Sequence, residues 1–243
     1  MTSKKRSPIF VSFSGMDGAG KSTQIDALRS WLIATGFRVR VLAFWDDVAV
    51  FGRFREVSSH VLFKSEKGIG SPEKPVERRD KNVRAWYMTL ARFFLYFADA
   101  LGLAAVIRKV KRQNDADVII FDRYLDDEIV NLNLNSSFSR SYARVLLSVC
   151  RRPEIAYLLD ADPVLARKRK PEYPLEFLHS IRESYISLSR ISGDLTMVGS
   201  GDVAAVASQI RERFEKLLRD PAHAPRPVSL VGQAELVDVH RVR

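Results

Sequence analysis

One short segment near the N-terminus combines glycines, a lysine and a serine in a spacing that suits phosphate chemistry. Gly15 to Ser22 read GMDGAGKS and fit the pattern G-x-x-x-x-G-K-[ST], after an apolar run and before a helical pattern. Glycines there let backbone N–H groups turn toward phosphate oxygens, and a following helix adds partial positive charge. We therefore interpret Gly15 to Ser22 as a phosphate-binding loop and use that name below.

The residue types within the phosphate-binding loop have distinct expected tasks. Lys21 would reach the β- and γ-phosphates of ATP, and the Ser22 hydroxyl would ligate Mg²⁺. A merely structural glycine-rich turn is the alternative, and the flanking strand and helix patterns argue against it. The expected ATP-binding residues are Gly15, Gly18, Ala19, Gly20, Lys21, Ser22 and Thr23.

A magnesium site also needs a carboxylate, and two aspartates follow apolar runs. Asp122 ends VIIFD, and Asp160 ends AYLLD. We favour Asp122 as the metal ligand, because Arg123 follows it at once and adds a phosphate-binding cation where ligands of α/β sheets bind. For Asp160, a helix-capping role is an equal alternative.

Phosphoryl transfer needs positive charge on the migrating group, and Lys21 alone supplies it within the loop. The run Arg167-Lys168-Arg169-Lys170 follows a predicted strand and could close over the phosphates as a lid. A solvated surface run is the competing interpretation. The predicted catalytic residues are Lys21, Arg123, Arg167 and Arg169.

Apolar runs and helical patterns alternate along the chain and would position these residues. Strands are expected at 8–14, 38–44, 118–121, 155–159 and 195–198. Helices are expected at 21–35, 84–111 with Gly102 as a candidate break, 139–150, 174–191 and 203–218. Strands separated by helices imply an α/β fold with a parallel sheet covered on both faces.

Bulk composition narrows the class of protein. The chain has 243 residues and one cysteine, Cys150, which excludes a disulfide framework and favours a cytoplasmic location. Its N-terminus also lacks the apolar stretch of a secretory signal. Arg92 and Asp99 interrupt the apolar segment 85–107, which predicts a buried helix and no membrane span.

The formal net charge is +10, and it is unevenly distributed. Between Arg53 and Arg112, 14 basic residues stand against six acidic ones. Such an excess suits nucleic acid, an anionic membrane surface or small phosphorylated ligands, and the bulk charge does not decide among them. The sequence contains no recognisable nucleic-acid-binding module, so a nucleic-acid partner is the weaker expectation.

Three blocks together carry a family likeness: FSGMDGAGKSTQ, VIIFDRY, and LDADPVLARKRK with IRESY downstream. From about residue 8 to 219 they resemble the thymidylate kinase family of P-loop nucleotide kinases. The resemblance implies a three-layer α/β P-loop NTPase fold, with a five-stranded parallel sheet flanked by helices. It implies one kinase domain at 1–219 with a lid at about 162–173, and we assign no function to the tail at 220–243.

The resemblance also implies an activity and partners. Family members transfer the γ-phosphate of ATP to dTMP and use Mg²⁺, so we expect ATP, Mg²⁺ and a nucleotide acceptor, with a homodimer as a candidate assembly. Carried over residue by residue, Asp17 would bind the sugar 3′-hydroxyl and Arg123 the phosphates. Arg167 and Arg169 would stabilise the transferring group, since family members without a basic residue inside this loop place that arginine in the lid.

The acceptor half departs from the family pattern. After the second strand the chain reads FWDDVAVFGRFRE, where the family usually reads R-E-P-G-G-T, so Arg53 or Arg55 is the candidate for the phosphate-binding arginine. Asp46 or Asp47 could stand in for the acid. Arg92 and Tyr96, four residues apart on one helix, are candidates for contacting the base, and core packing or an ion pair is an equal alternative.

The block after Asp122-Arg123-Tyr124 departs as well. It continues LDDEIVN, where the family has a serine and an A-Y-Q-G stretch. An acidic patch there would repel a monophosphate and could hydrogen-bond the hydroxyls of a neutral acceptor. Two alternatives therefore stay open: a kinase of a nucleoside, sugar or other hydroxyl compound, and a nucleotide- or nucleic-acid-binding protein with little transfer activity.

Overall fold

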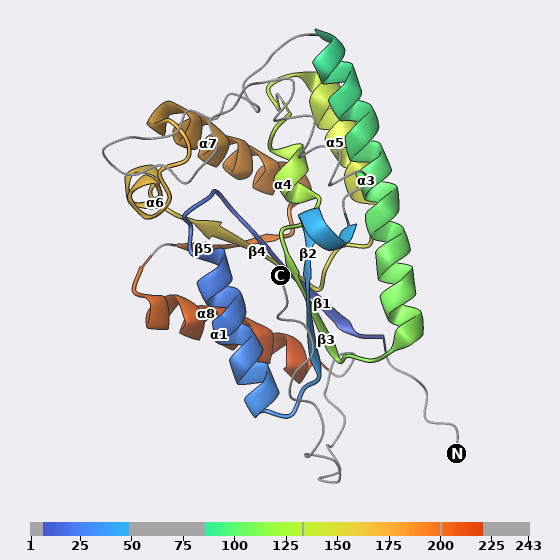
Figure 1. Ribbon diagram of the computed structural model, residues 1–243, viewed down its shortest axis with the longest axis vertical. Coiled ribbons are helices and arrows are strands. Elements are labelled where there is room, and N and C mark those ends of the chain that lie inside the picture. Colours follow the sequence, from blue (N-terminus) through green and yellow to red (C-terminus); the bar gives the residue numbers. More distant parts are fainter. Residues whose placement is uncertain (1–6, 49–85, 133, 200, 221–243) are drawn as a thin grey trace.

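Five parallel strands form one sheet at the centre of the molecule (Figure 1). The computed structural model describes residues 7–48, 86–132, 134–199 and 201–220. In the sheet the strands have the order β2-β3-β1-β4-β5. Their bounds are β1 (Ile9–Ser14), β2 (Val39–Ala43), β3 (Val118–Asp122), β4 (Ile155–Asp160) and β5 (Leu195–Gly199). The expected five-stranded parallel sheet is confirmed, and every strand ends at the same edge.

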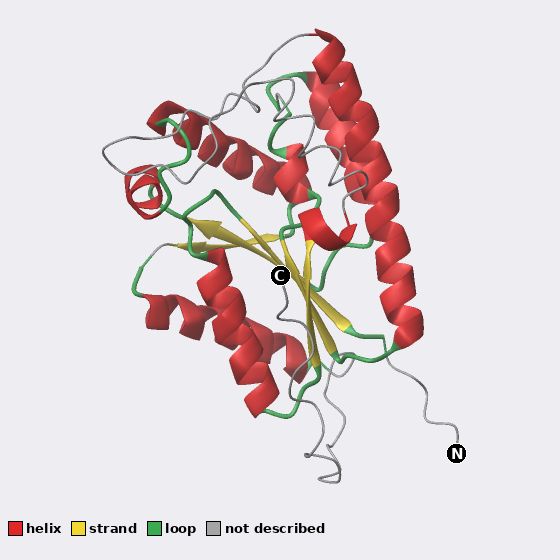
Figure 2. Ribbon diagram, viewed as in Figure 1, coloured by secondary structure: helices red, strands yellow, loops and turns green. Residues whose placement is uncertain are grey.

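Helices cover both faces of the sheet (Figure 2). Alternate side chains of β1 divide between the two faces: Phe10 joins one apolar cluster, and Val11 and Phe13 join the other. The first cluster includes residues of α3, α5 and α7, and the second includes residues of α1 and α8. The helices are α1 (Lys21–Ala34), α3 (Trp86–Gln113), α4 (Asp126–Ile129), α5 (Ser137–Val149), α6 (Pro163–Arg169), α7 (Leu175–Ser192) and α8 (Val203–Arg219).

Helix α3 runs without interruption through Gly102, so the expected break there is wrong. A glycine inside a helix costs about 1 kcal/mol relative to alanine. Ala100 and Leu103 on either side are fully buried against the sheet, and this burial offsets the glycine's cost. No helix in the described part of the chain has both the length and the hydrophobicity to cross a membrane.

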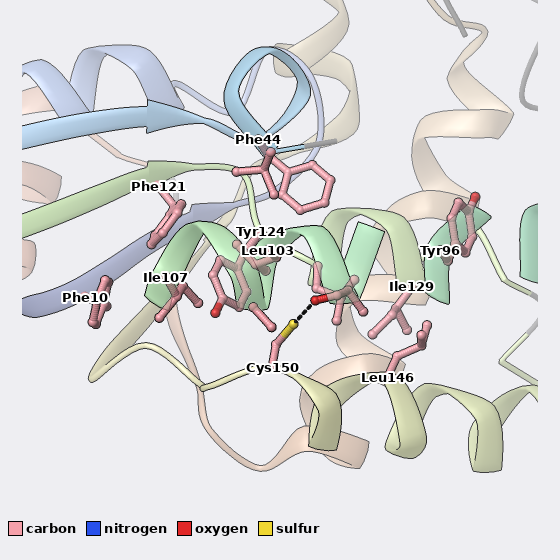
Figure 3. Close-up of a cluster of buried hydrophobic side chains, with 14 of the residues drawn as sticks. Phe10, Phe44, Tyr96, Leu103, Ile107, Phe121, Tyr124, Ile129, Leu146 and Cys150 are labelled. Carbon is pink, nitrogen blue, oxygen red and sulfur yellow. Dashed lines mark hydrogen bonds between the residues drawn. The ribbon is translucent and has the colours of Figure 1, made fainter. Parts of the chain in front are cut away.

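The cluster beneath α3 contains the single cysteine (Figure 3). The Cys150 thiol donates to the Ala100 carbonyl oxygen at 2.7 Å, as the dashed line in Figure 3 marks. Burial raises the pKa of this thiol to about 12. Cys150 is therefore a small apolar group of the core.

Several elements fall outside the expected ones. A single π-helical turn, Phe44–Val48, follows β2, and α4 and α6 are short helices after β3 and β4. Arg53, Arg55 and the tail from 221 onward lie outside the described residues.

Candidate functional site

The phosphate-binding loop presents the N-terminus of α1 at the carboxyl edge of the sheet. Gly20 adopts a left-handed conformation, with φ of 90°, and α1 begins at the next residue. Among the described residues no side chain caps α1, and the same holds for α4, α5 and α7, whereas Asp162 caps α6 and Asp202 caps α8. The first turn of α1 therefore keeps its N–H groups for an anion.

Lys21 lies folded into this loop. Its Nζ donates to the carbonyl oxygens of Gly15 at 2.8 Å and Met16 at 2.9 Å, and the residue is 7% exposed. Burial lowers the pKa of Lys21 to about 8, and the nearby Arg123 guanidinium acts in the same direction. Ser22 and Thr23 follow on the exposed side of the first turn.

Arg123 connects the loop after β3 to the phosphate-binding loop. Its Nη2 pairs with the Asp17 carboxylate, and its Nη1 lies 3.3 Å from Asp127 Oδ1. Its backbone has φ of 71°, a left-handed conformation that costs about 1–2 kcal/mol in a residue other than glycine. Such strain persists only where surrounding contacts hold it, and it is common at functional sites.

Asp122 lies beside the start of the phosphate-binding loop. Parallel pairing of β1 with β3 sets Asp122 opposite Phe13, two residues before Gly15. The carboxylate is half-buried, and burial raises its pKa, while Lys21 and Arg123 oppose that rise. The structure thus brings Lys21, Asp122 and Arg123 to one edge of the sheet, as the sequence predicted.

Helix α6 also lies against the phosphate-binding loop. Arg169 Nη1 donates to the Gly18 carbonyl oxygen at 3.4 Å, and Lys170 Nζ lies 3.8 Å from Asp17 Oδ1. Arg167 is half-buried on the same helix. The basic run therefore contacts the loop, and Lys170 is a contact that the sequence interpretation missed although it lies in that run.

A cavity opens next to the loop, between β4, β5 and α8. Its walls combine apolar side chains with Gly199, the last residue of β5, and Gly201. Arg169 and Thr23 are the charged and hydroxyl side chains of its lining that adjoin the phosphate-binding loop in sequence or by contact. The lining residues are Ala19, Gly20, Thr23, Gln24, Leu159, Asp160, Arg169, Val198, Gly199, Gly201, Val203 and Val206.

Asp160 has a structural partner rather than a cap. Arg182 of α7 donates to its two carboxylate oxygens at 2.6 and 2.7 Å. The residue that caps α6 is Asp162, which accepts from the backbone N–H groups of Val164 and Leu165. The capping alternative for Asp160 is therefore wrong, because the helix begins two residues later.

The expected acidic patch after Tyr124 is also wrong. Asp126, Asp127 and Glu128 are 0%, 3% and 0% exposed, because α4 turns them into the protein. Arg152, in the segment just before β4, donates to both carboxylate oxygens of Asp126 at 3.1 Å. It also pairs with Asp194. These acids belong to the interior and do not line an acceptor surface.

The remaining acceptor candidates are spread over different environments. Tyr96 is 8% exposed and packs in the core cluster with Leu103 and Ile129 (Figure 3). Arg92 is half-buried one turn earlier on α3. Asp47 accepts from the Ala43 N–H at 2.8 Å and so stabilises the turn after β2.

Comparison with known proteins finds thymidylate kinases. No protein-family profile matches the chain. A probable thymidylate kinase of Methanosphaera stadtmanae is 26% identical over 216 residues, 87% of this chain and 100% of that protein. A thymidylate kinase of Bifidobacterium longum is 30% identical over 167 residues, 67% of this chain and 71% of that protein. The structure of thymidylate kinase from Candida albicans has a TM-score of 0.60 at 17% identity and covers 89% of this chain and 94% of its own, which shows a shared fold.

Proposed function

Because this chain belongs to the thymidylate kinase family, we propose that it transfers the γ-phosphate of ATP to dTMP and releases ADP and dTDP. One observation carries the proposal beyond the family. Lys21, Asp122 and Arg123 meet beside an uncapped helix N-terminus. The two cations and the N–H groups of the helix neutralise phosphate charge, and the carboxylate suits a magnesium ion. The adjoining cavity offers apolar walls for a base.

The reaction then depends on position and charge. An oxygen of the acceptor phosphate attacks the γ-phosphorus, the bond to the β-γ bridging oxygen breaks, and ADP leaves. Lys21 and the N–H groups of α1 hold the phosphates of ATP, and Arg123 faces the transferring group. Arg169, with Arg167 on the same helix, supplies further positive charge from the lid. Such fixed cations stabilise charge that spreads over the transferring group.

Magnesium fits the oxygen donors present. Ser22 presents its hydroxyl on the exposed first turn of α1, and Asp122 presents a carboxylate at the end of β3. Mg²⁺ prefers oxygen ligands and keeps several waters or phosphate oxygens. When bound there, the ion would neutralise charge on the β- and γ-phosphates. Ser22 and Asp122 are the residues that would hold it.

The acceptor would lie on the Arg123 side of the loop. We propose that Asp17 accepts a hydrogen bond from the sugar 3′-hydroxyl, since its carboxylate stands beside Arg123 at this edge. Arg53, Arg92 and Tyr96 stay candidates for the acceptor's phosphate and base, and Arg53 lies outside the described residues.

A coupled assay of ADP release tests the function across acceptors. The panel contains dTMP, other nucleoside monophosphates and the neutral nucleoside thymidine. We expect turnover with dTMP and little with thymidine. Turnover with thymidine alone would favour the kinase of a neutral acceptor, and ATP binding without any turnover would favour a nucleotide-binding protein.

We also propose that the protein forms a homodimer and that it works in a reducing cytoplasm. Helix α3 exposes apolar side chains at helical spacing, Phe94, Phe97 and Leu101, with Phe94 74% exposed. Cys150 is a free thiol. Light scattering after size-exclusion chromatography should give twice the chain mass for the native protein and the single chain mass for Phe94→Glu.

A further inference from the structure

A buried carboxylate behind the site gathers donors from three parts of the chain. Asp127 Oδ2 accepts from the Ser14 hydroxyl at 2.6 Å and from the Tyr124 N–H at 3.1 Å. Its Oδ1 accepts from the Tyr185 hydroxyl at 2.8 Å and from Arg123 Nη1 at 3.3 Å. Four donors thus converge on one side chain that is 3% exposed.

These donors come from elements that border the proposed reaction. Ser14 is the last residue of β1 and directly precedes the phosphate-binding loop, and Tyr185 lies on α7, which follows the lid. Arg123 and Tyr124 form the turn after β3. Asp127 therefore joins the start of the phosphate-binding loop, the arginine turn and the lid's supporting helix at one point.

The shape of the turn explains why a carboxylate is needed. Arg123 has a positive φ, and the Asp127 N–H donates to the Tyr124 carbonyl oxygen at 3.0 Å, so side chain and backbone of Asp127 close the same turn. A carboxylate offers two acceptor oxygens and a negative charge. An amide offers one acceptor, so one pair of donors would face an N–H₂ group instead.

We propose that Asp127 is a positioning residue for the reaction: it holds the Arg123 guanidinium beside Asp17 and aimed at the transferring phosphate. The inference rests on the proposed function, because it assigns a purpose to the placement of Arg123. Asp127 touches no substrate and acts through the groups that it holds, chiefly Arg123. Removing its charge should loosen Arg123 most, because Arg123 is the charged donor among the four. Lys21 should stay in place, because its own hydrogen bonds go to the Gly15 and Met16 carbonyl oxygens.

Asp127→Asn is the test variant, and Asp126→Asn is its matched control. Both acids are buried on α4, but Asp126 pairs with Arg152 and takes part in none of the four hydrogen bonds to the Asp127 carboxylate. We expect Asp127→Asn to lower kcat by roughly 10- to 100-fold, because a misplaced group can cost a factor of 100. The KM for ATP should change by less than about threefold, and Asp126→Asn should stay within about twofold of the native kcat.

A double-substitution cycle separates positioning from general damage. If Asp127 acts through Arg123, Asp127→Asn should lower kcat little in a chain that already carries Arg123→Ala. An equal loss in both backgrounds, or an unchanged kcat for Asp127→Asn, would overturn the proposal. Where Asp127→Asn fails to fold, Tyr185→Phe replaces it in the same cycle, with a smaller loss in the same direction.

A spectroscopic readout keeps the proposal apart from the proposed function. The guanidinium N–H signals of Arg123 are assigned by their loss in Arg123→Lys. They should be resolved in proton–nitrogen NMR spectra of the native chain and of Asp126→Asn. They should broaden in Asp127→Asn. Retained signals in Asp127→Asn would refute positioning, whereas native protein that turns over no dTMP would refute only the function.

Discussion

Gly18 of the phosphate-binding loop and Ala166 of α6 approach so closely that a Cβ on Gly18 would lie 2.3 Å from the Ala166 carbonyl oxygen. Gly18 follows β1 and Ala166 follows β4, so two segments that are far apart in the sequence meet backbone to backbone. Arg169, three residues further along, donates to the Gly18 carbonyl oxygen. The lid helix can rest on the loop in this way only because residue 18 has no side chain.

Replacing Gly18 with alanine should therefore push α6 away from the loop. We expect kcat/KM to fall by roughly 10- to 100-fold, since the lid cation no longer reaches its place. Gly193→Ala is the control: Gly193 also has a positive φ, 72°, but nothing lies within 4 Å of its ideal Cβ. Thermal unfolding should show that both variants are destabilised. Steady-state kinetics should show that only Gly18→Ala loses catalytic activity. Equal activity in the two variants would contradict a role for the contact between α6 and the loop.

Lys21 gives the site a characteristic pH dependence. Its pKa of about 8 is lowered from 10.5 by burial, so the unfolded chain binds this proton more tightly than the folded one. Lys21 therefore makes the ligand-free protein more stable as the pH rises from about 8 toward 10.5. Phosphates bring negative charge that raises the pKa again, so ATP binding should take up a proton near pH 8.5.

Calorimetry in two buffers of different ionisation enthalpy measures this proton uptake. The heat of ATP binding at pH 8.5 should differ between the buffers for the native protein. Lys21→Arg keeps its charge at that pH, so its heat should differ much less. Buffer-independent heat in the native protein would show that Lys21 is already fully charged when free.

The four basic residues 167–170 should differ in their importance for the reaction. Arg169 contacts the Gly18 carbonyl and lines the cavity, whereas Lys168 is exposed on the same helix. Arginines on a transferring phosphoryl group are worth factors of about 10³ or more, so Arg169→Ala should lower kcat by at least ~100-fold. Lys168→Ala, the matched control, should remain close to native; similar losses in both would indicate a diffuse electrostatic effect.

The Cys150 thiol should resist modification in the folded protein. Its pKa of about 12 leaves almost no thiolate at pH 8, and its side chain is buried beneath α3. A chromogenic disulfide reagent should label Cys150 only when denaturant unfolds the chain. Rapid stoichiometric labelling of the native protein would show that the α3 layer opens.

The sequence predicted those parts of the site whose residues are close together in the chain. Gly15 to Ser22 form a contiguous loop, and Asp122 and Arg123 are adjacent at a strand end, so a local pattern was sufficient. The parallel sheet was equally accessible, because alternating apolar runs and helical patterns leave few other topologies.

Contacts between segments that are far apart in the sequence could not be predicted from local sequence patterns. Three consecutive acids looked like an acceptor surface, but Arg152, Ser14 and Tyr185 neutralise or satisfy two of them from far along the chain. Gly102 looked like a helix break because the pattern does not show how deeply its neighbours are buried. In both cases the tertiary fold buries the residues concerned, and this burial outweighs the preference of the local sequence.

The proposed function is the transfer of one phosphoryl group, and the position of an isotopic label tests it most directly. The native chain is incubated with Mg²⁺, dTMP and ATP labelled at its γ-phosphorus, and the products are separated. We expect label in the β-phosphate of dTDP, with unlabelled ADP formed in equal amount. Label found only in inorganic phosphate, or only in a product made from thymidine, would contradict it.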